Sequence, residues 1–105
     1  MSGCDATTVQ GSFRAEDAGW RFEGALTLDN AAHVMADADA RPLPADSVID
    51  FAGLTRADSS ALAVIMALRR RAAAESRTLS VRNLPGSLTS LARAYGVDEL
   101  VCDAG

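Results

Sequence analysis

The sequence predicts an α/β fold: one domain with a mostly parallel sheet of four to five strands, an antiparallel N-terminal hairpin, and helices packed against the sheet. Segments that alternate apolar and polar residues precede segments with helical apolar spacing, in the order β-β-α-β-α-β-α. Strands that alternate with helices of this length pair in parallel, because each helix returns the chain to the same end of the sheet. With 105 residues, of which 49% are hydrophobic, the chain can bury one core.

The two ends of the chain are expected to differ from its middle. Residues 1–11 are small and polar, so we expect a flexible N terminus before a domain that spans residues 12–102. Residues 97–101 are expected to add a last short strand or a turn.

The predicted hairpin comes first. Phe13 precedes the polar residues 16–19, and the alternating run of residues 20–23 follows them, a pattern typical of two strands joined by a tight turn. One face of this hairpin is expected to be buried, and it carries Trp20, Phe22 and Leu26.

Helical spacing then predicts a helix from Asn30 to about Asp39. Its apolar positions are Ala31, Val34, Met35 and Ala38. Thr27 or Asp29 is available as the N-cap. Two prolines in residues 41–44 end the helix and form a connecting loop.

The middle of the chain predicts a strand and a long helix. Residues 48–51 are apolar apart from Asp50, which is consistent with an interior strand. A helix is expected from Ser60 to about Ser76, with arginines at residues 69–71 suited to the negative pole of the helix. Its apolar face carries Leu62, Ile65, Met66 and Leu68.

A third strand over residues 79–81 and a third helix complete the pattern. The helix opens at Pro85, and Gly96 occupies the C′ position that favours glycine. Its periodic residues are Leu88, Leu91, Ala92 and Tyr95. The core of the whole fold is expected to include Ile49, Phe51, Leu62, Ile65, Val81, Leu88 and Leu91.

Charge and composition exclude several classes of function. The net charge is −4 and all ten cations are arginine, which argues against general binding to nucleic acid or to anionic lipid. No apolar run approaches the roughly 20 residues that cross a bilayer, and no secretory signal is visible, so a cytosolic protein is expected. Cys4 and Cys102 are then expected to be two thiols in a reducing compartment, with a disulfide that ties the two ends as the alternative.

The sequence offers no catalytic constellation. Ser59 and Ser60 lack the flanking glycines of a nucleophile elbow, and no phosphate-binding G-x-x-x-x-G-K-[ST] loop is present. His33 has no positioned partner that would make it a general base. We therefore expect a protein that is not an enzyme and uses neither a cofactor nor a metal; a hydrolase built on Ser59 and His33 lacks the required geometry.

The informative segment is Asp58-Ser59-Ser60, between the predicted middle strand and the long helix. A hydroxyl at a helix N-terminus meets unpaired N–H groups and the positive pole of the helix, so it can cap the helix or carry an anion. The simpler interpretation is a helix cap, worth about 1 kcal/mol. The alternative is a binding or modification site.

The run from Ile49 to Leu62, IDFAGLTRADSSAL, resembles the signature of STAS domains, the family of anti-sigma factor antagonists. The resemblance covers roughly residues 13–101 and implies the fold described above. It also implies that the first serine after the Asp, here Ser59, is the phosphate acceptor in regulatory members. Ala61 stands where glycine is common, which is expected to tighten access to the serine slightly. The site residues carried over are Thr55, Arg56, Asp58, Ser59 and Ser60.

Residues 88–97, LTSLARAYGV, are in addition similar to the end of the third helix in the MlaB-type subfamily of STAS domains. That likeness implies a cytosolic subunit that docks on the MlaF-like ATPase of an Mla phospholipid ABC transporter and regulates or stabilises it. Threonine commonly stands at the position of Ser59 in that subfamily, and its hydroxyl faces the ATPase. Contacts are expected from a turn formed by residues 55–60 and from the exposed sides of the second and third helices. The alternative partner is an anti-sigma factor with kinase activity that phosphorylates Ser59, where the added charge would block docking.

Overall fold

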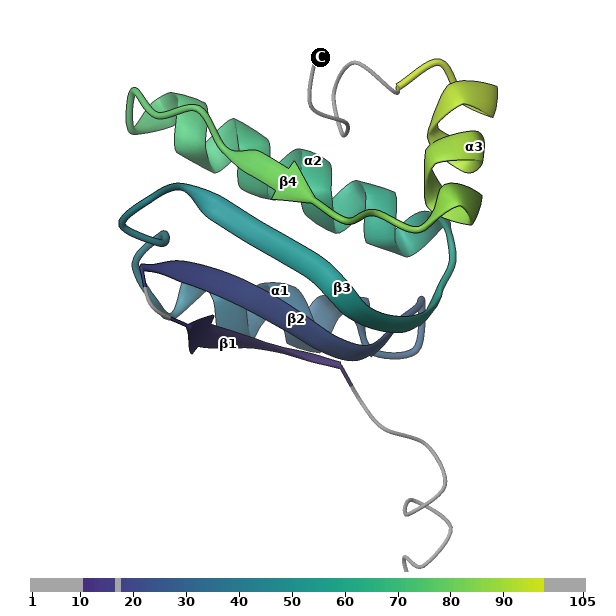
Figure 1. Ribbon diagram of the computed structural model, residues 1–105, viewed down its shortest axis with the longest axis horizontal. Coiled ribbons are helices and arrows are strands. Elements are labelled where there is room, and N and C mark those ends of the chain that lie inside the picture. The colour runs from purple at the N-terminus through teal and green to yellow at the C-terminus, as the bar shows by residue number, and fades with distance from the viewer. Residues whose placement is uncertain (1–10, 17, 98–105) are drawn as a thin grey trace, which may run out of the picture.

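The computed structural model describes residues 11–16 and 18–97. Apart from Gly11 and Val97, the expected flexible N terminus and last strand lie outside these residues. The elements follow the predicted order: β1 (Ser12–Glu16), β2 (Gly19–Leu26), α1 (Ala31–Asp39), β3 (Val48–Ala57), α2 (Ser59–Ala74), β4 (Ser80–Arg82) and α3 (Gly86–Ala94) (Figure 1).

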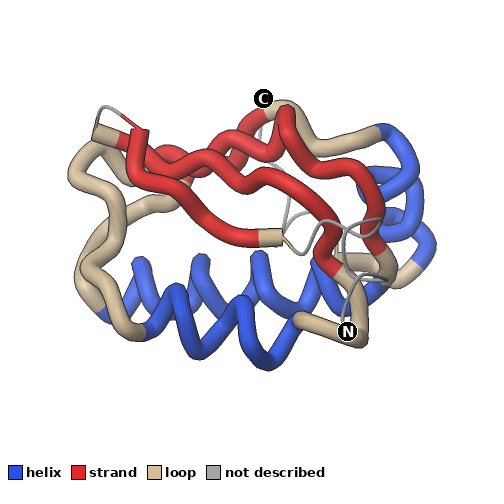
Figure 2. Tube along the Cα trace, turned by 90° about the horizontal axis from the view of Figure 1, so that it is seen from below, coloured by secondary structure: helices blue, strands red, loops and turns tan. Residues whose placement is uncertain are grey.

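The four strands form one mixed sheet in the order β1-β2-β3-β4. β1 pairs antiparallel with β2, and the other two pairs are parallel, as expected from the sequence. Each crossover moves one strand further in the same direction, and crossovers of the same hand place their helices on the same face. Figure 2 shows α1 and α2 together on that face, whereas α3 contacts α2 at one end of the molecule.

The core lies between the sheet and these helices. The predicted face of β2 is buried, with Trp20 5%, Phe22 0% and Leu26 0% exposed. Phe22 lies 5.0 Å from Phe13 and 5.8 Å from Phe51 between ring centroids, so the aromatic residues of three strands form one cluster.

Of the other predicted core residues, one is misplaced. Leu91 is only partly buried, because the buried stripe of α3 runs through Leu88 and Ala92 and Leu91 lies at its margin. The remaining predicted core residues are buried, namely Ile49, Phe51, Leu62, Ile65, Val81 and Leu88.

β3 is longer than the sequence predicts. It does not end near Phe51 but continues to Ala57, because β2 supplies pairing partners as far as the Leu26–Ala57 pair. Gly53 lies where the two strands come closest: a Cβ there would be 2.8 Å from the carbonyl oxygen of Phe22. Residues 52–57, which lie beyond the predicted strand, therefore belong to the sheet.

The start of α1 also differs from the prediction. Asn30, rather than Thr27 or Asp29, holds the N-cap position, and its side chain makes no capping bond. Instead, the Asn30 amide accepts from the backbone N–H of Thr27 at 2.9 Å and donates to the carbonyl of Ala25 at 2.8 Å. This buried side chain fixes the loop between β2 and α1.

Two helices end in the same way. Gly96, with φ 72°, follows α3, and the N–H of Val97 donates to the carbonyl of Ala92 at 2.9 Å, as expected for a Schellman motif. α2 ends with the same bonds, but its left-handed residue is Ser76, with φ 60°.

Candidate partner-binding site

The junction between β3 and α2 is built around Asp58. Its backbone is extended, with φ −131° and ψ −165°, and its Oδ1 accepts from the N–H of Ser60 at 2.8 Å. Asp58 is therefore the N-cap of α2, and Ser59 is the first residue of the helix. The helix cap that the sequence suggested for this segment is therefore made by the aspartate and not by a serine hydroxyl.

Asp58 also joins two loops that are far apart in the sequence. Its Oδ2 accepts from the backbone N–H of Leu28, in the β2–α1 loop, at 3.0 Å. The carboxyl ends of parallel strands meet at one edge of a sheet, so these loops are neighbours in space. One carboxylate thus ties the β2–α1 loop to the start of α2.

These contacts keep the Asp58 carboxyl ionised. The N–H of Leu28 is the largest cause that lowers its pKa below 3.8, and the bonds from Ser60 and the charge of Arg56 act in the same direction. Burial opposes them. A carboxylate that accepts two backbone N–H groups is stabilised in its charged form.

Ser59 lies on the outward side of α2. Its side chain is exposed, and Ala63, Met66 and Arg70 follow it along the same side at helical spacing. Ala63 and Arg70 are exposed and Met66 is partly buried. The small side chain of Ala63, one turn from Ser59, allows a partner to approach this end of the helix closely.

Ala61 does not affect access to Ser59 in the way the sequence suggested. It is 0% exposed and belongs to the buried side of α2, opposite the stripe that carries Ser59. Its methyl group therefore fills the core and does not narrow the approach to the hydroxyl.

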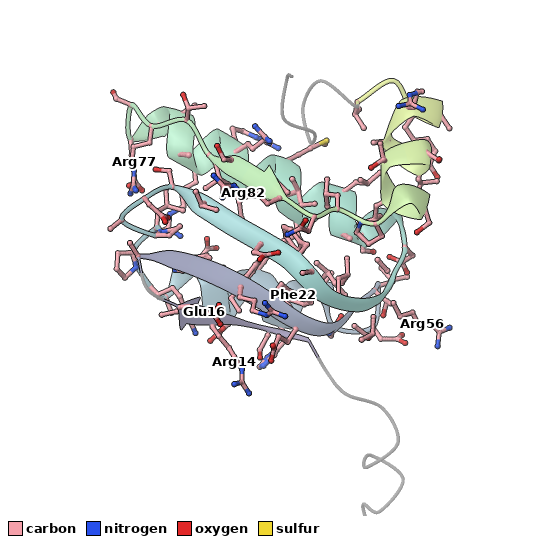
Figure 3. The ribbon with its side chains drawn as sticks, viewed as in Figure 1. Arg14, Glu16, Phe22, Arg56, Arg77 and Arg82 are labelled. Atoms are coloured by element: carbon pink, nitrogen blue, oxygen red, sulfur yellow. The ribbon has the colours of Figure 1, made fainter. Side chains whose placement is uncertain are left out.

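The other candidate residues surround the junction. Thr55 and Arg56 are exposed and belong to β3, not to a turn. Figure 3 shows Arg56 projecting at the end of the molecule where β3 meets α2, with Arg77 at the opposite end. Ser60 is partly buried, with its N–H bound to Asp58.

A pocket of about 290 Å³ lies between the two loops. It is lined by Ala25, Thr27, Leu28, Asp29, Arg56, Ala57 and Asp58. Arg56 and Asp58 thus share one pocket, and Thr55 lies outside its lining. The β2–α1 loop was not among the candidates from sequence.

Leu28 is exposed on this loop and was not among the candidate residues from the sequence. Its side chain is 78% exposed, the largest value among the exposed large hydrophobic residues that the structure describes. The signal in the sequence was a single leucine between Thr27 and Asp29, directly after a strand.

Within residues 11–16 and 18–97, no group of three or more His, Cys, Asp or Glu side chains could hold a metal ion. In the same residues no helix is both long and apolar enough to cross a membrane. His33 is exposed on α1.

No curated protein matches the chain. A family model described as "Mlab, STAS domain" matches residues 9–102, which include every described element and the Asp58–Ser59 junction. The chain belongs to the STAS domain family, and the model that it matches describes the MlaB type.

Proposed function

We propose that the chain is a non-enzymatic binding subunit that docks on the ATPase of an Mla-type phospholipid ABC transporter and regulates or stabilises it. In this role it acts at the cytoplasmic side of the inner membrane, held there by its partner, and contributes to lipid asymmetry. The match to the "Mlab, STAS domain" model supports this assignment.

One observation carries the proposal: Ser59 is exposed at the head of α2 although it is not the residue that caps the helix. Because Asp58 supplies the cap, the Ser59 hydroxyl is available to an external group. The stripe that continues through Ala63, Met66 and Arg70 provides a surface onto which an ATPase helix can pack.

A phosphorylation switch is the second candidate function. An exposed serine at a helix N-terminus suits a phosphate, since the positive pole of the helix stabilises added negative charge. The partner would then be an anti-sigma factor with kinase activity. A neighbouring sigma factor gene favours this function, and neighbouring permease and ATPase genes favour the transporter.

Co-expression tests the main proposal. The chain, tagged at one end, is expressed with an MlaF-like ATPase from the same genome, and we expect the two to co-purify in a fixed ratio. Removal of the chain should change the ATPase's thermal stability or its rate of ATP hydrolysis. Failure of the ATPase to co-purify, together with phosphate transfer from ATP to Ser59 by an anti-sigma kinase, would favour the switch instead.

A further inference from the structure

We infer that Leu28 is an apolar anchor of the docking surface and that Asp58 is a positioning residue that holds it. This inference rests on the proposed function, because it extends the ATPase-binding surface from α2 onto the β2–α1 loop. The occupant it commits to is the ATPase subunit, through an apolar recess on that protein that receives the Leu28 side chain.

The first argument is the combination of exposure and order at Leu28. A side chain that is 78% exposed leaves most of a leucine's apolar surface in water. Its backbone is nevertheless fixed: Leu28 N–H donates to Asp58 at 3.0 Å, and the Asn30 side chain accepts from the N–H of Thr27 and donates to the carbonyl of Ala25. An apolar group presented on a fixed loop loses less backbone entropy on binding than one on a mobile loop.

The second argument is the chemistry around Leu28. Asp29 and Arg56 are exposed and line the pocket together with Leu28, and Ala25 and Ala57 add apolar side chains to the lining. An apolar centre with a charged rim is the ordinary anatomy of a protein–protein interface. Such a centre suits a protein surface better than a small anion, because the N–H of Leu28 is already bonded to a carboxylate.

The third argument is continuity with Ser59. The carboxylate that accepts from Leu28 also accepts from Ser60, the residue after Ser59. The same partner surface can therefore contact the leucine and the serine. Both Asp58 oxygens accept from backbone N–H groups of the chain itself. The aspartate therefore affects partner binding by holding the two loops in place.

The binding arm of the test compares variants against the purified ATPase. Leu28→Ala should weaken its binding by about tenfold or more, the loss expected for an interface anchor. Thr78→Ala, at an exposed residue outside both loops and α2, is the matched control and should leave the affinity unchanged. Thermal unfolding should be nearly the same for wild type and both variants, because each change is at an exposed side chain.

The outcomes separate the two proposals. If Ser59→Asp weakens binding and Leu28→Ala does not, docking at α2 stands and the Leu28 anchor is wrong. If wild type does not bind the ATPase, both proposals fail. If Leu28→Ala leaves ATPase binding unchanged but abolishes self-association seen by light scattering, the occupant is a second copy of the chain, which also contradicts the inference.

The positioning arm uses Asp58→Asn. Asparagine caps helices as well as aspartate does, but its amide nitrogen is a donor and cannot replace the Oδ2 that accepts from Leu28. We therefore expect α2 to persist, the Leu28 amide to exchange its hydrogen faster with solvent, and ATPase binding to weaken in the same direction as in Leu28→Ala. Unchanged hydrogen exchange at Leu28 would contradict the positioning role of Asp58.

Discussion

Ser76 is a non-glycine residue in a backbone conformation that favours glycine. It follows α2 with φ 60°, in the left-handed region that favours glycine, and its N–H completes the helix end by donating to Ala73 at 3.0 Å. Gly96 occupies the equivalent position after α3. The sequence therefore predicts the end of α3 from its glycine, but it gives no such signal for the end of α2.

Ser76→Gly should raise the free energy of unfolding by about 0.5 kcal/mol. Left-handed backbone costs a non-glycine residue roughly 1–2 kcal/mol, and the extra freedom of glycine in the unfolded chain offsets part of that gain. Urea unfolding followed by circular dichroism measures the difference. Thr78→Gly, in the same loop but without positive φ, should lower stability; a loss in both variants would refute the strain at Ser76.

At the site, the sequence could predict only those residues that a local pattern identifies. Asp58 and Ser59 stand before an apolar helical run, and the structure places them at the start of α2. Leu28 was missed because its importance depends on the bond to Asp58, 30 residues away. Periodicity within one segment carries no information about such a bond.

At the scale of elements, α2 is tied to the loop after α1 by an arginine. Arg71 donates to the carbonyls of Ala38 at 3.0 Å and Arg41 at 2.6 Å. The sequence suggested only that arginines at residues 69–71 suit the negative pole of the helix. The carbonyls that Arg71 binds, one in the last turn of α1 and one in the loop after it, could not be predicted, since they come from a different part of the chain.

Arg71→Lys should lower the free energy of unfolding by about 1–2 kcal/mol. The single ammonium of lysine cannot reproduce a guanidinium that binds two carbonyls, and a lost bond to a charged donor has about this magnitude. Chemical denaturation gives the value. Arg70→Lys, at the adjacent exposed position, is the matched control and should change stability by less than about 0.5 kcal/mol; equal effects would show that Arg71 does not anchor the loop.

For the helices and strands, too, some features could be predicted from the sequence and others could not. The order of strands and helices was predictable, because the period of two and the helical period are both visible in the sequence. The length of β3 was not, because residues 52–57 are held in the sheet by pairing with β2 and not by an apolar alternation of their own.

At the scale of the whole molecule, the open face of the sheet carries a row of charges. Arg14, Arg21, Asp50 and Arg82 lie at paired positions of the four strands. The Asn83 amide, which donates to Asp50 at 2.9 Å, is the largest cause that lowers the Asp50 pKa, followed by the N–H of Ala52. The charges of the neighbouring arginines act in the same direction and burial opposes them.

Stability should therefore fall in acid. Asp50 and Asp58 both have folded-state pKa values below the ordinary 3.8, so the stability that they contribute is present above about pH 4 and is lost as the pH falls through the lowered values. Urea unfolding at a series of pH values measures the fall. The double variant Asp50→Asn, Asp58→Asn should show a shallower decline; an equally steep one would mean that other carboxyl groups cause it.

The measurement that tests the central claim most directly is the affinity of Ser59 variants for the ATPase. Asp at the first helical position suits the helix dipole, so Ser59→Asp should fold normally, but its charge would be buried without a partner on docking. Isothermal titration should show binding at least about 100-fold weaker for Ser59→Asp and nearly unchanged for Ser59→Thr, which keeps the hydroxyl. If Ser59→Asp binds the ATPase as tightly as wild type does, Ser59 is not in the interface and the account of this site is wrong.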